Sequence, residues 1–418
     1  MTAIRSVPFN RIRFHLDEPV LDHVSAATDR TLAASGVVIE AGARVAITVG
    51  SRGIRDLVPV VGRVANWVRQ QGGEPFLVPA LGSHGGATAD GQREVLEAYG
   101  LDDPAIGCPI TSSMDVVELD QRDCPVRVFT DANAFAADAT IIVNRVKPHT
   151  DFHGPYESGI MKMTAIGLGK QVQADVLHAY GVRGLRDFMP LVARRVLAEG
   201  KVVLGVAIVE NALDRTMLVE AIPAAKIPDR ERVLLDEARA HSPTLAIGHL
   251  DVLLIDRMGK DISGVGMDTN VIGRILITGQ DDPSTPRIAM IACHALTSAS
   301  HGNATGMGLA DVVTRELADA IDHDVTRTNI ITSGFLLRGK LPVVAEDDRH
   351  AWELCLRGAG VVDVAGVRAA RIVDTLHCAD VWVTDAVLTG LADDPRVEVL
   401  STGLELHDDT GVLSPFGC

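Results

Sequence analysis

The stretch RVAITVGSRGIRDLVPVVGRVANWVRQQGGEPFLVPA, residues 44–80, decides the fold class. Residues 44–49 form a short β-rich apolar run that is typical of a buried strand. Residues 58–71 carry the longer amphipathic pattern of a helix, and residues 75–80 are strand-like again. This alternation of short strands with longer helices indicates an α/β protein.

The same alternation continues along the chain. Further strands are expected at residues 139–144, 202–209, 251–256 and 288–292, and further helices at about 90–99, 185–199, 228–240, 309–321 and 347–357. Because the pattern breaks at 241–248, we predict an N-terminal domain over 1–245 and a C-terminal domain over 246–418. Each is expected to be a mainly parallel sheet flanked by helices. No low-complexity linker separates them, so we expect an active-site cleft between the two domains.

Charge, apolar content and cysteine spacing exclude several classes of protein. The 39 basic and 55 acidic residues give a net charge of −16, the wrong sign for holding a nucleic-acid backbone. Apolar runs are far shorter than the roughly 20 residues that cross a bilayer. The N-terminus MTAIRSVPFNRIRF lacks the apolar stretch of a secretory signal, and the six cysteines form no C-x-x-C pair. We therefore expect a cytoplasmic protein that binds neither nucleic acid nor membrane.

Lysine is rare in this chain and locally crowded beside histidine. The chain has 7 Lys against 32 Arg, and the stretch 147–178 holds three of those Lys and three of the 14 His. An amine and a guanidinium are not interchangeable, because only the amine readily loses its proton and becomes a nucleophile. A lysine kept in an arginine-rich chain is therefore a candidate for a chemical role.

Polar residues that follow the first two strands are candidates for ligand binding, because ligands of open α/β sheets bind beyond the carboxyl ends of the strands. Arg52 and Arg55 follow the strand at 44–49 in the turn GSRGIRD, just before a helix, where they could bind an anion. An ordinary glycine turn fits this segment equally well. His84 follows the strand at 75–80 in LGSHGG, and its ring can transfer protons near neutral pH, although a surface loop histidine fits too.

The third junction is NRVKPHTDFHGP, residues 144–155. His149 and His153 are four residues apart, which on a helix would form a metal-binding face, but the neighbouring proline and glycine indicate a loop. Lys162 follows Gly-Ile-Met, an apolar setting that favours a nucleophilic amine, with a solvated loop lysine as the alternative. A set of His, Lys and Arg with few carboxylates suits a small anionic substrate and proton transfer.

At these residues the sequence resembles the lactate racemase family, whose members use a nickel-pincer nucleotide (pyridinium-3-thioamide-5-thiocarboxylic acid mononucleotide with nickel). The resemblance spans about the first 180 residues. It rests on G-S-H at 82–84, K-P-H at 147–149, the glycine-flanked Lys162, and His178 sixteen residues later. It implies an isomerase, a racemase or epimerase of 2-hydroxy acids, which depends on cofactor-synthesis enzymes for its activation.

The resemblance also implies roles for four residues. Lys162 would hold the nucleotide covalently, and His178 would bind its nickel. His84 and His149 would be opposed acid–base residues, one for each stereoisomer, during proton-coupled hydride transfer to the cofactor.

Substrate binding would involve further residues by the same resemblance. Arg52, or less well Arg55, would hold the substrate carboxylate, and Lys260 in the C-terminal half would also bind substrate. The interval before Lys162 is longer than in lactate racemases and contains His153, which competes with the preceding histidine for the base role or contacts the substrate. We therefore expect a hydroxy acid larger than lactate, such as a sugar acid.

Two other functions remain open at this point. One is a divalent-metal hydrolase or lyase that uses His149, His153 and His178 as metal ligands. The other is a non-catalytic protein that binds a metal or a nucleotide. Two opposed imidazoles at one site would separate the racemase from both.

Overall fold

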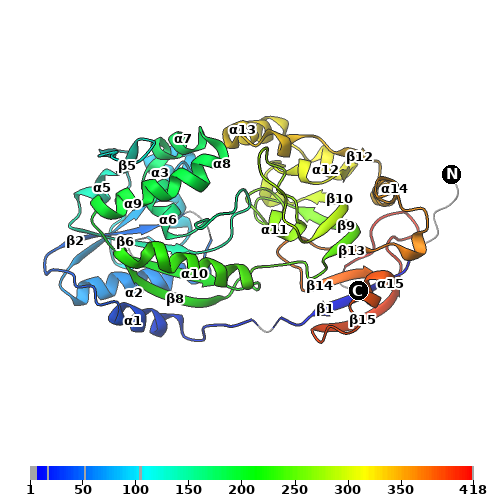
Figure 1. Cartoon of the computed structure of the whole chain (residues 1–418), viewed down its shortest axis with the longest axis horizontal. Helices are drawn as coiled ribbons and strands as arrows, with labels where there is room; N and C mark the ends of the chain where they lie inside the picture. Colours follow the sequence, from blue (N-terminus) through cyan, green and yellow to red (C-terminus); the bar gives the residue numbers. More distant parts are fainter. Residues whose placement is uncertain (1–6, 17, 51–52, 103–105, 417–418) are drawn as a thin grey trace. The chain divides into compact units, whose positions relative to one another are not determined.

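The computed structural model describes residues 7–16, 18–50, 53–102 and 106–416, and its chain divides into two compact units (Figure 1). One unit is Glu18–Ser242, called here the 18–242 unit. The other, called the C-terminal unit, combines the described residues of Met1–Asp17 with those of Pro243–Cys418. The C-terminal unit therefore combines two segments that are far apart in the sequence.

The 18–242 unit is built, within its described residues, on a five-stranded sheet and a two-stranded ribbon. In sheet order the strands are β3 (Glu74–Pro79), β2 (Arg44–Val49), β6 (Ala139–Arg145), β7 (Val202–Glu210) and β8 (Thr216–Pro223); the ribbon pairs β4 (Val116–Leu119) with β5 (Val128–Asp131). The first four strands of the sheet are parallel, and β8 is an antiparallel edge strand. This arrangement confirms the predicted parallel-rich sheet.

Helices cover both faces of this sheet. They are α1 (Val24–Ala34), α2 (Leu57–Gln70), η1 (Gly85–Ala87), α3 (Ala89–Ala98), α5 (Ala132–Ala136), α6 (Ile160–Lys162), η2 (Met163–Gly167), α7 (Lys170–His178), α8 (Gly181–Arg183), η3 (Gly184–Phe188), α9 (Met189–Glu199), η4 (Ala224–Lys226) and α10 (Ile227–Ala240). Successive residues of β2 point to opposite faces: Ala46 packs in the same apolar cluster as α9 and α10, whereas Val45 and Ile47 pack with α1 and α2. Burial on both faces explains why this strand is apolar almost throughout.

The C-terminal unit contains, among its described residues, an eight-stranded sheet. In sheet order its strands are β12 (Val343–Ala345), β11 (Val312–Thr314), β10 (Arg287–Leu296), β9 (His249–Met258), β13 (Ala369–Ile372), β14 (Asp380–Thr384), β1 (Phe9–Phe14) and β15 (Val397–Leu404). The strands from β12 to β13 are parallel, and β14, β1 and β15 continue the sheet antiparallel. Its helices are α11 (Thr269–Ile272), η5 (Ser298–Ser300), η6 (Met307–Leu309), α12 (Arg315–Asp319), α13 (His323–Ser333), η7 (Leu336–Gly339), α14 (Asp348–Gly358), η8 (Val364–Gly366) and α15 (Asp385–Gly390).

Two sequence expectations differ from the structure. The helix expected over 309–321 is wrong in its first half, because residues 312–314 form β11 between β10 and β12, and α12 begins only at Arg315. Three consecutive β-branched side chains favour the strand, and pairing on both sides fixes it. The N-terminal domain was expected to start at residue 1, but residues 9–14 form β1 in the C-terminal unit.

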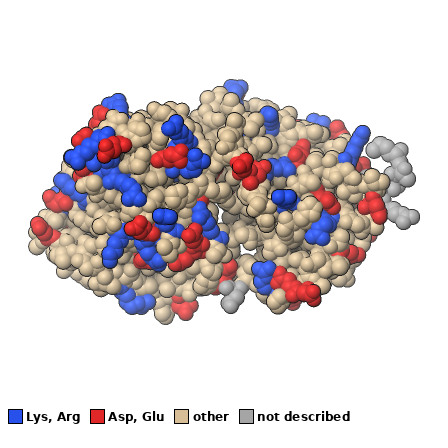
Figure 2. Space-filling model, in the orientation of Figure 1, with Lys and Arg blue, Asp and Glu red and all other residues tan. Residues whose placement is uncertain are grey.

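Charges on the molecular surface are mixed. Figure 2 shows Lys and Arg side chains standing among Asp and Glu side chains on the face drawn. In the part of the chain that the structure describes, no helix combines the length and the apolar character needed to span a membrane.

Candidate functional site

Strand ends of the 18–242 unit meet a helical run that carries two of the candidate residues. The run consists of α6, the π-helical turn η2 and α7, and it places Lys162 near its start and His178 at its end. After β3, the amide of Gly82 donates to the carbonyl of Gly167 at 3.3 Å. From β6, Asn144 Nδ2 donates to the carbonyl just before α6 at 3.0 Å. Two of the predicted strand-end junctions therefore converge on this one helical run.

His149 contacts the candidate anchor lysine. Its ring is buried, and its Nε2 lies 2.5 Å from Lys162 Nζ. The amide of Asp151 donates to Nδ1 at 3.0 Å, and the Phe152 ring packs against the imidazole with centroids 4.7 Å apart. Both ring nitrogens thus have partners, and the ring is held in one orientation beside the lysine.

The charge of the same lysine affects the pKa of His178. Its ring is accessible to solvent, yet surrounding protein atoms reduce its hydration, which lowers the pKa of His178 below its usual value. The positive charge of Lys162 lowers this pKa further, whereas Asp175 and Asp151 act in the opposite direction. The imidazole therefore favours its neutral form, which is the form that binds a metal ion.

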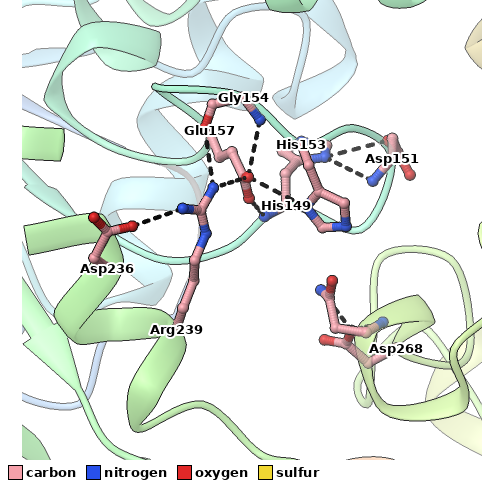
Figure 3. Close-up of polar contacts among 9 residues, drawn as sticks. His149, Asp151, His153, Gly154, Glu157, Asp236, Arg239 and Asp268 are labelled. Atoms are coloured by element: carbon pink, nitrogen blue, oxygen red, sulfur yellow. Dashed lines mark hydrogen bonds and ion pairs between the residues drawn. The ribbon is translucent and has the colours of Figure 1, made fainter. Parts of the chain in front are cut away.

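A buried carboxylate, Glu157, organises the loop between β6 and α6 (Figure 3). It accepts hydrogen bonds from the amide of His149 at 2.6 Å, from the amide of Gly154 at 3.2 Å and from Arg239 of α10 at 2.6 Å. His153 Nδ1 lies 3.2 Å from the same carboxylate. Burial acts to raise the pKa of Glu157, but the bonds from His153, His149 and Arg239 outweigh it and lower the pKa. Glu157 therefore stays charged, and its contact with Nδ1 orients the ring of His153.

A second buried carboxylate, that of Glu231 in α10, accepts hydrogen bonds from the start of α6. It accepts the amide of Met161 at 2.8 Å, one residue before Lys162. Complete burial raises the pKa of Glu231 to about 7, although the helix amides it accepts act to lower that value. A Cβ on Gly159 would overlap this carboxylate, so the glycine is required by the close approach. Sequence reasoning missed both carboxylates, because no local motif marks them.

His84 lies in a turn that follows a different strand, β3. It lies exposed in the turn after β3, directly before η1. Its carbonyl accepts a hydrogen bond from Gln92 of α3 at 3.3 Å. Gly85 follows with φ +66°, and a Cβ there would overlap the backbone of Gly91. The turn predicted from L-G-S-H-G-G is thus a closely packed one.

Three basic residues are expected to bind the substrate. Arg52 lies outside the described residues. Arg55 is exposed, and its amide donates to Glu210 at 2.8 Å. Lys260 belongs to the C-terminal unit, where it follows β9 and its Nζ donates to the carbonyl of Gly264 at 2.8 Å and to Asn329.

Three histidines do not form the metal site considered above. Within the described ranges, no group of three or more His, Cys, Asp and Glu side chains is arranged to hold a metal ion. His149 directs Nε2 to Lys162, and His153 directs Nδ1 to Glu157. The geometry therefore gives no support to a cluster of these two rings with His178.

Comparison with solved structures finds the fold of lactate racemase. The chain matches the lactate racemase apoprotein from Thermoanaerobacterium thermosaccharolyticum with a TM-score of 0.52 and 10% sequence identity, over 84% of this chain and 95% of that one. A Thermotoga maritima protein solved by a structural genomics consortium matches with a TM-score of 0.44 and 10% identity, over 67% and 72% of the two chains. No family model matches the chain, and no curated protein matches its sequence. At this identity the likeness establishes a shared fold, and it confirms the fold that the sequence resemblance implied.

Proposed function

We propose that this protein is a racemase or epimerase of 2-hydroxy acids larger than lactate, such as sugar acids, and that it works with a nickel-pincer nucleotide joined to Lys162. The observation that carries the proposal is the contact between Lys162 Nζ and His149 Nε2, beside a helix that ends in His178. Two residues singled out by sequence order are thus in contact in a chain with the fold of lactate racemase, which supports the proposal.

The residues present fit the cofactor. Lys162 offers an amine, which can form the amide-type link that a guanidinium cannot. His178 lies sixteen residues further along the same helical run, and its lowered pKa keeps the imidazole available as a ligand. His178 would supply the protein's ligand to the nickel, so the proposal requires one imidazole rather than a cluster of side chains. When bound, the cofactor supplies an electrophilic ring that accepts a hydride.

Proton transfer falls to the two histidines. His149 Nε2 faces Lys162, so a substrate hydroxyl held beside this lysine lies within reach of that nitrogen. His153 is the weaker candidate, because its Nδ1 already contacts the buried carboxylate of Glu157. His84 comes from another strand end and serves the opposite stereoisomer. One histidine would take the hydroxyl proton of a given stereoisomer, and the opposed histidine would donate a proton to the same oxygen as the other stereoisomer forms.

Substrate binding is proposed for the basic residues outside this group. Arg52, or Arg55, would hold the carboxylate, since an arginine fork matches a carboxylate in geometry and charge. Lys260 would contact the substrate from the C-terminal unit. We accordingly propose that the 18–242 unit binds the cofactor and that residues of the C-terminal unit contribute to substrate binding.

An isotope experiment tests this function. The protein, produced together with cofactor-synthesis enzymes, is incubated with a panel of 2-hydroxy acids that carry deuterium at C2. Inverted product that keeps its deuterium supports hydride transfer, whereas hydrogen from water at C2 contradicts it. His149→Ala and His84→Ala should each lower kcat by about 10²- to 10⁴-fold. His153→Ala is the matched control and should stay within a few fold of the unsubstituted protein.

A further inference from the structure

Lys170, at the start of α7, is fully buried, although the candidate chemistry does not use it. Its ammonium lies 3.1 Å from Asp131 and donates to Gln92 Oε1 at 3.0 Å. It also donates to the carbonyl of Pro79, the last residue of β3. Each of the three ammonium protons can therefore be donated to a different element of the 18–242 unit, namely β5, α3 and β3.

Gln92 carries this network to the turn that holds His84. Its side chain is fully buried, and its Nε2 donates to the carbonyls of Gly82 at 2.9 Å and His84 at 3.3 Å. One amide group thus joins Lys170 on its oxygen side to two carbonyls of the turn on its nitrogen side. Together with the Pro79 contact, the network holds the chain just before the turn and within it.

The energetics of the network argue for a positional role. Burial lowers the pKa of Lys170 and raises that of Asp131, and the attraction between their opposite charges offsets only part of this effect in each group. A buried ion pair of this kind adds little net stability, because the desolvation cost is about as large as the attraction. Lys170 also adopts φ +54°, a left-handed conformation that costs a non-glycine residue energy. What the network does provide is a fixed placement of the groups it joins.

We infer that Lys170 and Gln92 are positioning residues for His84. Helix α7 begins at Lys170 and ends at His178, so one helix both anchors the His84 turn and presents the proposed nickel ligand. The inference rests on the proposed function in one respect, because His84 matters for turnover only if it is an acid–base residue. That the network holds the turn is a separate statement, which can be tested without any cofactor.

Gln92→Glu tests the network with the smallest change of shape. The substituted side chain still offers an acceptor to Lys170, but it cannot donate to the carbonyls of Gly82 and His84. Hydrogen exchange of the full-length, cofactor-free chain is followed over residues 81–86, and thermal unfolding is recorded alongside. We expect exchange in this turn to become about tenfold faster, while exchange elsewhere in the 18–242 unit and the Tm change little.

The same variant, loaded with cofactor, gives a second readout. Displacement of His84 should lower kcat by roughly 10- to 100-fold and leave KM within about threefold. Gln121→Glu is the matched control, because Gln121 Nε2 also donates to a backbone carbonyl, that of Cys124 at 2.9 Å, in a turn that the proposed site does not use. The control should change neither the exchange over residues 81–86 nor kcat.

A second variant keeps the test decisive if the first one fails to fold. Lys170→Met combined with Asp131→Asn removes both buried charges, and the asparagine can still accept the Ala134 amide that Asp131 caps. Unchanged exchange over residues 81–86 in the folded variants would overturn the inference. Loss of folding in both variants would also overturn it, since the network would then serve stability. If the unsubstituted protein racemises no acid of the panel, the proposed function fails, while the exchange result still decides what the network does.

Discussion

Two buried carboxylates decide how the candidate site residues are held. Glu157 binds the amide of His149, and Glu231 binds the amide that precedes Lys162. The sequence allowed the histidines and the lysine to be found, because glycines, a proline and strand ends surround them. It gave no means of finding Glu231, which lies 70 positions from the amide it accepts and follows an ordinary helical pattern. Contacts between distant residues carry no local signal.

The pKa of His178 should respond to its charged neighbours with opposite signs. Lys162→Met removes a positive charge and should raise the pKa of His178, whereas Asp175→Asn removes a negative charge and should lower it. Nuclear magnetic resonance titration of the histidine rings in the cofactor-free chain measures both shifts. Shifts of the same sign in the two variants would show that these two charges do not act on the pKa of His178 in opposite directions.

Stability should depend on pH through Glu231. Its pKa in the folded chain, about 7, lies above its ordinary value of 4.5, so the folded state holds the proton more tightly than the unfolded state. The resulting stability is fully present below pH 4.5 and is lost as the pH rises through about 7. Compared with Glu231→Gln, the unsubstituted chain should lose up to about 3 kcal/mol of unfolding free energy between pH 4.5 and 8. Urea unfolding at several pH values measures this, and parallel curves for the two proteins would contradict it.

At the scale of elements, strands and helices with strong local patterns were predictable, and those set by distant pairing were not. The strand expected at 44–49 is β2 with the same bounds, and the helix expected at 228–240 is α10, which begins one residue earlier. By contrast, the helix expected over 309–321 is interrupted at residues 312–314, whose pairing between β10 and β12 fixes them as a strand. Register and sheet order depend on contacts between segments far apart in the chain, which periodicity does not record.

Two glycine substitutions should have opposite effects on stability. Gly159→Ala forces a methyl group into the Glu231 carboxylate at the start of α6 and should destabilise the 18–242 unit by about 1–3 kcal/mol. Gly62→Ala lies within α2, where an added Cβ meets its nearest neighbour at 3.9 Å, and should stabilise by about 0.5–1 kcal/mol. Urea unfolding measures both. A Gly159→Ala protein as stable as the unsubstituted one would show that α6 and α10 are less closely packed.

For the whole molecule, the division into units follows from one strand. β1 pairs with β14 and β15, so residues 9–14 belong with a sheet whose other strands begin about 240 residues later. Composition and periodicity did not reveal that residues 9–14 pair with strands from the other end of the chain. A pairing between residues 9 and 404 leaves no trace in local sequence.

Fragments should report this division directly. A fragment of residues 18–242 should fold cooperatively, whereas residues 243–418 alone lack β1 between β14 and β15 and should fold poorly. Circular dichroism and urea unfolding of the two fragments make the comparison. A 243–418 fragment as stable as the same unit in the full chain would show that β1 is dispensable.

Mass spectrometry of Lys162 tests the central claim most directly. The chain is produced with cofactor-synthesis enzymes, and its lysine-containing peptides and nickel content are measured, with Lys147 as the internal control. The account predicts a nucleotide adduct on Lys162 alone, about one nickel per chain, and loss of both in Lys162→Arg but not in Lys147→Arg. Racemisation by a chain whose Lys162 remains unmodified would contradict it.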